Sequence, residues 1–416
     1  MSEFDVRRNK LLEKMEDNSI ALVFAGTSKI TSEDEYFPFV VNRNFYYLTG
    51  ITQENSVLML VKCLGENKAY LFIDPYDPVK ERWTGKRINP DEAKEKSQMN
   101  NVYFTTSFES MLTLALEKKE YGKINHVYVD LTPEIKISNK SYTTDFANKI
   151  TEKYFGIKVI DLYPLVMRMR MIKSEEEIED IREAIKKTNL GINKLIMNLY
   201  QGKYEYELAD QFEFNGREKG KDNLAFNTII ASGVNATCLH YPTQDAMIKE
   251  EDLILFDLGY RHNLYCADIS RTYPVNGKFE GMQKKIYEAV LNCNKAVISF
   301  IKEGLLIKDL QEFATNYLKN ECVRMKIISP TDDIKKYYIH NVSHHLGLDT
   351  HDCADRSLPL EAGNVITVEP GLYFPELKIG VRIEDDVLVT HGRAEVLSGG
   401  IIKEINDIEK MFKTRR

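Results

Sequence analysis

The feature that most constrains this 416-residue chain is an acid inside sequence that otherwise has the composition of a buried β-strand. Residues 253–259 are Leu-Ile-Leu-Phe-Asp-Leu-Gly, apolar on both faces apart from Asp257. A buried ionised carboxylate costs several kcal/mol unless a cation or hydrogen-bond donors accompany it. Asp268 follows in a second β run, and a hairpin that pairs Tyr260 with Tyr265 across a four-residue loop would place the two aspartates opposite each other. Two facing acids repel, so the pattern predicts a bound cation.

A second pair of acids shows the same arrangement downstream. Residues 365–369, Val-Ile-Thr-Val-Glu, form a β run that ends in Glu369, and Glu384 lies in the β-rich stretch that follows. A hairpin centred between Glu376 and Leu377 would place Glu369 opposite Glu384. A single buried acid is more often a hydrogen-bonded structural residue, but two facing pairs favour a metal site.

Histidines gather close to these acids. The chain has eight histidines, and four of them fall between residues 340 and 351. One imidazole added to the acids gives a candidate ligand set of Asp257, Asp268, His344, Glu369 and Glu384. Four carboxylates balance the charge of two divalent ions, and oxygen-rich ligation with one imidazole favours Mn²⁺, with Co²⁺, Fe²⁺ or Zn²⁺ as alternatives. Two ions that share a water supply a nucleophile at neutral pH, so the pattern predicts metal-assisted hydrolysis.

The overall composition excludes several other classes of protein. Lys and Arg total 56 against 63 Asp and Glu, a net charge of -7, so no global field favours nucleic acid or an anionic membrane. No apolar run reaches the length of about 18 residues that a membrane span needs, and no signal peptide is visible. The six scattered cysteines form no C-x-x-C pair, which fits reduced thiols and predicts a cytoplasmic location.

The hydrophobic pattern divides the chain into two domains. β runs at 19–24, 56–62 and 69–73, with helical stretches between later ones, predict an α/β domain over residues 1–168. Ser174 and Glu177 form the capping box of a long helix that opens a second domain, residues 169–416. There a long helix, a shorter helix and β-rich sequence occur twice, which predicts two similar α+β halves with a site between them. The four predicted helices span residues 175–200, 205–219, 282–302 and 308–325.

Together, the strings that carry the acids and histidines resemble the pita-bread metallopeptidases, the family of aminopeptidase P, prolidase and methionine aminopeptidase. These strings are Phe-Asp-Leu-Gly at 256–259, Asp-Ile-Ser-Arg-Thr at 268–272, Ser-His-His-Leu-Gly-Leu-Asp at 343–349, Val-Glu-Pro-Gly-Leu-Tyr at 368–373 and Arg-Ile-Glu-Asp-Asp at 382–386. Segments 42–50 and 81–87 resemble the N-terminal domain of aminopeptidase P and prolidase. The resemblance implies an α+β fold: a pita-bread catalytic domain of two pseudo-symmetric halves after a smaller α/β domain. It also implies a homodimer or homotetramer.

The resemblance assigns a role to each candidate ligand. Asp257 would hold one metal, and His344 with Glu369 the other, while Asp268 and Glu384 would bridge the two ions. A hydroxide between the ions would attack the scissile carbonyl. Glu369 would also act as the proton shuttle to the leaving nitrogen.

It further implies residues that contact the substrate. His240 and His351 would be catalytic, stabilising the tetrahedral intermediate near the scissile bond. His340 would face the region beyond the proline, and Arg382 would support the acid cluster. Trp83, the single tryptophan, is either a core residue or, as in such N-terminal domains, a side chain that approaches the active site of a neighbouring subunit.

The remaining histidines and one departure complete the comparison. His345 is expected to be structural, and His126, His262 and His391 to be surface or internally satisfied histidines. Relatives often have tyrosine where this chain has Phe226, so any hydrogen bond from that hydroxyl to the metal site is absent here.

The resemblance favours an Xaa-Pro aminopeptidase, which removes an N-terminal residue that precedes proline. Because proline lacks an N–H and has a fixed φ, ordinary peptidases act on it poorly and a dedicated enzyme is needed. The alternative is a prolidase restricted to Xaa-Pro dipeptides. A metal-free binding module of the same fold is disfavoured, as is creatinase-like chemistry, because the ligand acids are intact. Methionine aminopeptidase is disfavoured by the N-terminal domain and the chain length.

Overall fold

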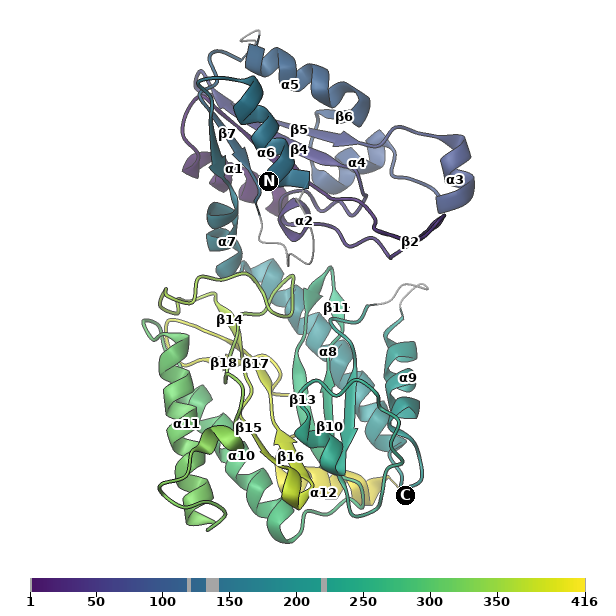
Figure 1. Ribbon diagram of the computed structural model, residues 1–416, viewed down its shortest axis with the longest axis vertical. Helices are drawn as coiled ribbons and strands as arrows, with labels where there is room; N and C mark the ends of the chain where they lie inside the picture. The colour runs from purple at the N-terminus through teal and green to yellow at the C-terminus, as the bar shows by residue number, and fades with distance from the viewer. Residues whose placement is uncertain (1, 118–120, 132–141, 218–222, 416) are drawn as a thin grey trace. The chain divides into compact units, whose positions relative to one another are not determined.

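The computed structural model describes residues 2–117, 121–131, 142–217 and 223–415 (Figure 1). The chain divides into two compact units, Met1–Met167 and Arg168–Arg416, here called the N-terminal and C-terminal units. None of the described helices combines the length and apolar character needed to cross a bilayer. All six cysteines lie within the described ranges and are free thiols.

The N-terminal unit is built on a six-stranded sheet in the order β6-β5-β4-β1-β7-β8. Strand β4 is antiparallel to β1 and β5, and the other neighbours are parallel. The strands are β1 (Ser19–Phe24), β4 (Val57–Cys63), β5 (Glu66–Ile73), β6 (Val102–Phe104), β7 (His126–Val129) and β8 (Lys158–Asp161). A separate hairpin pairs β2 (Ile30–Ser32) with β3 (Glu35–Tyr36).

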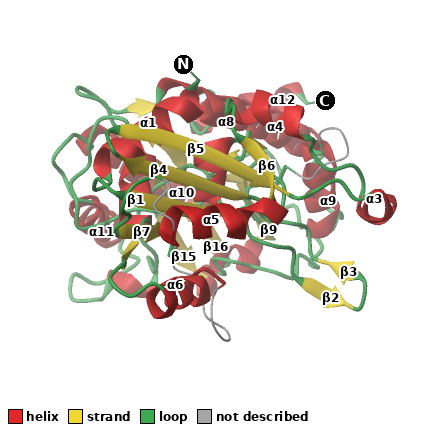
Figure 2. Cartoon of the chain, turned by 90° about the horizontal axis from the view of Figure 1, so that it is seen from above, coloured by secondary structure: helices red, strands yellow, loops and turns green. Residues whose placement is uncertain are grey.

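Helices cover both faces of this sheet, as Figure 2 shows from above. One face of β1, with Ile20 and Leu22, packs against α5 (Phe108–Glu117) and α6 (Tyr142–Lys153). On the other face of the sheet, α2 (Arg43–Thr49) contacts β1 and β4, and α1 (Glu3–Lys14) contacts β4. The remaining helices of the unit are α3 (Pro78–Thr84), α4 (Pro90–Ser97) and the start of α7 (Tyr163–Met171). Strand β1 is therefore buried along its whole length, which explains its unbroken apolar run.

The C-terminal unit contains the predicted repeat of two helices followed by strands (Figure 1). The first half has α8 (Glu175–Met197), α9 (Glu205–Gly216) and a sheet in the order β13-β10-β9. These strands are β9 (Ile229–Ser232), β10 (Leu253–Leu258) and β13 (Ile269–Pro274). The expected capping box starts α8: the Ser174 side chain accepts from the Glu177 N–H, and the Glu177 carboxylate accepts from the Ser174 N–H.

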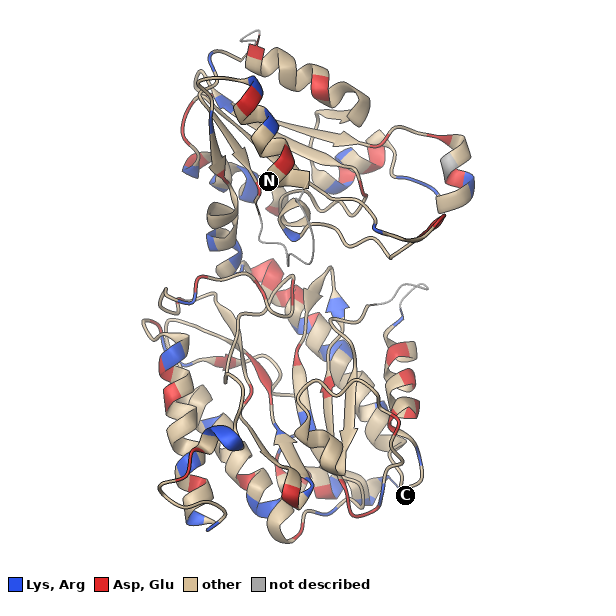
Figure 3. Cartoon of the chain, viewed as in Figure 1, with Lys and Arg blue, Asp and Glu red and all other residues tan. Residues whose placement is uncertain are grey.

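The second half repeats this order with α10 (Gly281–Phe300) and α11 (Ile307–Arg324). Its strands form two small sheets, β14-β17-β18 and β15-β16, and α12 (Ile405–Thr414) follows. The strands are β14 (Val365–Val368), β15 (Gly371–Phe374), β16 (Ile379–Arg382), β17 (Asp385–Leu388) and β18 (Glu395–Val396). Figure 3 shows acidic and basic residues interspersed on the outer helices, whereas β17 carries two fully buried acids, Asp385 and Asp386.

The first hairpin differs in register from the prediction. Asp257 pairs with Ser270 rather than with Asp268. The connecting turn has only two residues, Asn263 and Leu264, with φ of 46° and 67°, and it joins β11 (Arg261–His262) to β12 (Tyr265–Cys266). Two-residue turns with positive φ match the twist of paired strands, which explains why the shorter loop forms. A shift of two residues keeps both aspartates on the same face.

The second hairpin has the predicted register. Val368 pairs with Asp385 and Gly371 pairs with Arg382, and both pairs fit a turn centred between residues 376 and 377. The acids Glu369 and Glu384 lie between these two pairs, opposite each other, where neither β14–β17 nor β15–β16 continues. The strand ladder is thus open at the position of the two glutamates.

Candidate active site

A cavity of about 200 Å³ in the C-terminal unit collects both pairs of acids and four histidines. Its walls come from the loop before β10, from β10, from the residue before β13, from the segment 340–356, and from β16 and the strand ends beside it in the second half. The lining residues are Leu239, His240, Asp257, Asp268, His340, Asn341, Ser343, His344, His351, Arg356, Glu369, Arg382 and Glu384.

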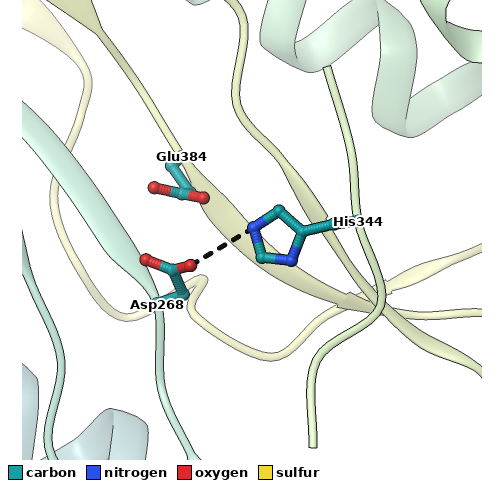
Figure 4. A group of neighbouring side chains, drawn as sticks. All are labelled: Asp268, His344 and Glu384. Atoms are coloured by element: carbon teal, nitrogen blue, oxygen red, sulfur yellow. Dashed lines mark ion pairs between the residues drawn. The ribbon is translucent and has the colours of Figure 1, made fainter. Parts of the chain in front are cut away.

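The cavity floor holds a group of side chains with metal-binding geometry. One ligand atom each from Asp268, His344 and Glu384 lies within 4.8 Å of the others. Figure 4 shows the three side chains pointing toward one another. His344 Nε2 is 3.4 Å from Asp268 Oδ2 and 3.5 Å from Glu369 Oε1. These four residues come from both halves of the unit, and the fold brings them together.

The orientation of His344 suits a metal ligand. Its Nδ1 lies 3.1 Å from the His345 carbonyl oxygen, an acceptor, and its backbone N–H donates to Thr367 Oγ1 at 3.2 Å. A carbonyl at Nδ1 keeps the proton on that nitrogen and leaves a lone pair on Nε2. This lone pair faces the carboxylates of Asp268 and Glu369.

Asp257 is held at the side of the cluster by cationic and hydroxyl neighbours. Arg382 Nη2 donates to Asp257 Oδ2 at 2.6 Å, and Arg382 Nε donates to Ser270 Oγ at 2.7 Å. Ser270 Oγ lies 3.2 Å from Asp257 Oδ1 and 2.7 Å from Glu384 Oε2. Ser270 is not among the predicted site residues, although its position two residues after Asp268 implies that the two side chains share a face.

His340 lines the cavity and contacts Tyr373, which is not itself among the lining residues. His340 Nε2 is 2.8 Å from Tyr373 OH, and His340 Nδ1 is 3.5 Å from Glu369 Oε2. Arg382 Nη1 donates to Tyr373 OH at 3.1 Å, so this hydroxyl links the histidine to the arginine. Tyr373 is also not among the predicted site residues, although it is the last residue of the 368–373 string.

Burial and mutual repulsion leave the acids poorly stabilised by the protein itself. Burial, and then the charges of Asp257 and Glu369, raise the pKa of Asp268 well above its usual range. Burial and the neighbouring Asp268 do the same to the pKa of Glu384, and burial and Glu384 to that of Glu369. Arg382 compensates only part of this repulsion. A set of hard carboxylate oxygens with one imidazole therefore fits divalent cations.

The remaining predicted residues lie in different places. His240 and His351 line the cavity, and the His351 ring is 4.2 Å from that of His344. Burial lowers the pKa of His351 and of His340 to about 4, so both imidazoles are neutral at pH 7. Trp83 lies on α3 of the N-terminal unit and is 78% exposed, so its interpretation as a core residue is wrong.

The other histidines and Phe226 lie outside the described lining of the cavity. His345 is buried, as expected of a structural residue, and burial lowers its pKa to about 3. His126 lies 3.3 Å from Glu16, while His262 and His391 lie within 4 Å of an acid each, Asp180 and Glu303. Phe226 packs beside Gly259, where a Cβ would be 2.9 Å from its ring.

Comparison with known proteins identifies both parts of the chain. Residues 179–391 match the model of metallopeptidase family M24, and residues 4–124 match that of the aminopeptidase P N-terminal domain. The Xaa-Pro aminopeptidase of Haemophilus influenzae is 33% identical over 429 residues, which cover 99% of this chain and 97% of that protein.

Solved structures agree with the match. A structure from Bacillus anthracis, provisionally assigned as an aminopeptidase P, superposes with a TM-score of 0.95 at 41% identity and covers 100% of this chain and 98% of that one. Escherichia coli aminopeptidase P with the inhibitor Pro-Leu superposes with a TM-score of 0.90 at 30% identity, covering 100% and 99%. The predicted fold class is confirmed. Since the matched region includes every candidate ligand from Asp257 to Glu384, and the relatives cover the full chain, the protein belongs to metallopeptidase family M24.

Proposed function

We propose that this protein is a metal-dependent aminopeptidase that hydrolyses the bond before a proline in the second position of a peptide. The observation that carries the proposal is that side chains of metal-binding type from both halves of an M24 domain line one cavity. The proline specificity is supported by full-length relatives named Xaa-Pro aminopeptidase.

Two divalent ions are the proposed cofactors. The residues that would hold them are Asp257, Asp268, His344, Glu369 and Glu384. When bound, such ions polarise the scissile carbonyl and lower the pKa of water. Mn²⁺ is the proposed ion, because four carboxylates and a single imidazole favour it over thiolate-seeking zinc.

The chain's own residues would orient the peptide and move the proton. Glu369, which borders both His340 and His344, would accept the proton of the attacking water and pass it to the proline nitrogen. His240 and His351, on the cavity wall, would donate hydrogen bonds to the oxygen that becomes negative in the transition state. Arg382 would keep Asp257 in place through its ion pair.

Cleavage of longer peptides is favoured over a dipeptidase activity. The E. coli relative binds the inhibitor Pro-Leu, in which a further residue follows the proline. A peptide of this form is what remains after an aminopeptidase removes the residue before proline. His340 would then lie beside the residue that follows the proline.

The test is removal and replacement of metal. Protein treated with a chelator and dialysed is expected to lose activity on an Xaa-Pro-Yaa tripeptide and to regain it with Mn²⁺. The activity restored by Co²⁺ and by Zn²⁺, each added separately, would rank the ions against Mn²⁺. Cleavage of Xaa-Pro dipeptides alone would identify a prolidase, and full activity in verified metal-free protein would refute the metal assignment.

Substitution of a bridging acid tests the same proposal. Asp268→Ala is expected to abolish turnover and leave the circular dichroism spectrum unchanged, because it removes one of the three clustered ligands. Asp210→Ala, which changes an exposed acid on α9, serves as the control. Retained turnover in Asp268→Ala would rule out the ligand set.

We also propose a cytoplasmic homo-oligomer, a dimer or tetramer, in which Trp83 is covered by a second subunit. Tyr36, Phe37, Val79 and Trp83 are all more than half exposed in the single chain. Because Trp83 is the single tryptophan, its fluorescence reports on this surface alone. Light scattering is expected to give a multiple of the 48.1 kDa chain mass. A monomer mass with water-exposed tryptophan emission would contradict the proposal.

A further inference from the structure

The strand ladder of the second hairpin is interrupted at the two glutamates, and one proline causes part of the gap. Pro370 faces Ile383, and its carbonyl oxygen accepts the Ile383 N–H at 3.4 Å. The reciprocal bond cannot form, because proline has no N–H to give to the Ile383 carbonyl. Glu369 and Glu384 use their own N–H groups elsewhere, donating to Val342 at 2.9 Å and to Ser270 at 3.0 Å.

A side chain from α10 bonds to the backbone at this gap. Asn294 is fully buried, and its Nδ2 donates to the Val368 carbonyl at 3.0 Å and to the Ile383 carbonyl at 3.3 Å. A carboxamide has two N–H donors, and here one bonds to the end of β14 and the other to the residue just after β16. Val368 and Ile383 are the residues directly before Glu369 and Glu384, so one amide joins the two segments that carry metal ligands.

The amide itself is held in one orientation by a buried charge network. Lys403 Nζ donates to Asn294 Oδ1 at 2.8 Å. Because an ammonium group can only donate, this bond fixes the amide with its oxygen toward Lys403 and its Nδ2 toward the carbonyls of Val368 and Ile383. Lys403 also pairs with Asp385, whose other oxygen accepts from Arg271 Nη2 at 2.8 Å. Arg271 in turn donates to the carbonyl of Glu384. The network thus bonds to two successive backbone carbonyls, those of Ile383 and Glu384.

We propose that Asn294 is a positioning residue for the metal centre and sets the separation of Glu369 and Glu384. It acts through the backbone of Val368 and Ile383 and does not line the cavity. This inference rests on the proposed function, because it concerns the affinity of the same ligands for metal. Residues that orient ligands in this way typically change metal affinity or activity by about 10- to 100-fold when altered.

Two substitutions separate positioning from general stability. Asn294→Leu removes the amide at similar volume, and Asn294→Asp keeps the oxygen that Lys403 binds but has no N–H donors. Asn292→Leu, an exposed position two residues earlier on α10, is the matched control. Metal-free protein is titrated with Mn²⁺ by calorimetry, and kcat and KM are measured on an Xaa-Pro-Yaa tripeptide.

The expected result is an affinity for Mn²⁺ about 10- to 100-fold weaker in both Asn294 variants and unchanged in Asn292→Leu. We expect kcat to fall with little change in KM and to recover partly at high Mn²⁺. Wild-type Mn²⁺ affinity in a folded Asn294 variant, even one that melts earlier, would overturn the inference. If Asn294→Leu does not fold, Asn294→Asp decides. Absence of Mn²⁺ binding by the unaltered protein would instead refute the proposed function.

Discussion

At the scale of single residues, Ser270 shows how a small hydroxyl connects two acids that would otherwise repel. Its Oγ lies between Asp257 and Glu384 and accepts a hydrogen bond from Arg382. The acids belong to strands far apart in sequence, so this hydroxyl relates the position of one ligand to that of another. It is fully buried.

Ser270→Ala is therefore expected to weaken Mn²⁺ binding and lower kcat/KM by about 10- to 100-fold. The reason is that Asp257 and Glu384 lose the group that orients both. Ser299→Ala on the exposed face of α10 is the control. Calorimetric titration with Mn²⁺ and steady-state kinetics on an Xaa-Pro-Yaa peptide give the two readings. Unchanged values for both would show that the hydroxyl has no part in orienting the ligands.

At the scale of elements, a buried ion cluster ties the segment that carries His351 to the start of the C-terminal unit. Asp352 pairs with Arg170, near the end of α7, and with Lys173, just before α8. The distance from Lys173 Nζ to Asp352 Oδ2 is 3.1 Å. Burial by itself raises the pKa of Asp352, but the attraction of the two cations is stronger and the pKa lies below its ordinary value. The neighbouring Gly347 leaves no room for a side chain, since its Cβ would be 2.3 Å from the Asp352 carboxylate.

The lowered pKa of Asp352 predicts a pH-dependent contribution to stability. A carboxyl group whose pKa is lower in the folded than in the unfolded chain stabilises the fold. The stabilisation is fully present at pH values above the unfolded-state pKa, about 3.9 for Asp, and it is lost as the pH falls through the folded-state pKa. Asp352→Asn is expected to lower the free energy of unfolding by about 3–5 kcal/mol at pH 7, because it leaves buried cations unpaired. The deficit relative to wild type should shrink below pH 4. Urea unfolding at several pH values measures the difference in free energy of unfolding between the two proteins. Glu312→Gln, which changes an exposed acid on α11, is the control. A deficit that does not vary with pH would contradict the assignment.

A close contact between β16 and the short helix η2 (Gly233–Thr237) predicts a second effect at this scale. A Cβ on Gly380 would lie 2.0 Å from the carbonyl oxygen of Ala236, a backbone atom that cannot rotate away. Gly380→Ala should destabilise the fold by about 1–3 kcal/mol, as overpacking does. It should also lower kcat, because η2 leads into His240 on the cavity wall. Gly400→Ala, where no atom lies within 4 Å, is the control. Thermal melts and kinetics that match wild type would show that the segment adapts freely.

At the scale of the whole molecule, the acid cluster makes stability depend on metal. Burial raises the pKa of three of its carboxyl groups, so the metal-free fold retains acids that water would solvate better. Ions that bind only the folded chain raise its free energy of unfolding by about 2.7 kcal/mol when their free concentration is 100 times Kd. For a unit of this size that corresponds to an increase in Tm of roughly 5–10 °C.

Calorimetry of metal-free protein with and without Mn²⁺ tests this dependence. Mn²⁺ should raise the Tm of the wild-type protein. It should raise the Tm of Asp268→Ala only weakly, because that variant lacks a central ligand. Mg²⁺ at the same concentration controls for ionic strength. Equal shifts in wild type and Asp268→Ala would mean that the stabilising ion binds elsewhere.

The chain's own pattern determined the element types, the register of the second hairpin and the chemistry of the site. It did so because apolar periodicity, capping residues and acids in buried strands are local signals. The register of the first hairpin was not predictable in this way. Asn263 is a residue type that favours positive φ, but Leu264 adopts a positive φ that its residue type disfavours. Ser270, Tyr373 and Asn294 gained their roles only when distant segments met in space. Local sequence describes which side chains can bind a metal, but only tertiary packing decides which buried polar groups hold them in place. The reason is that such partners are often distant in sequence, as are Ser270 and Glu384, 114 residues apart, and Asn294 and Val368, 74 residues apart.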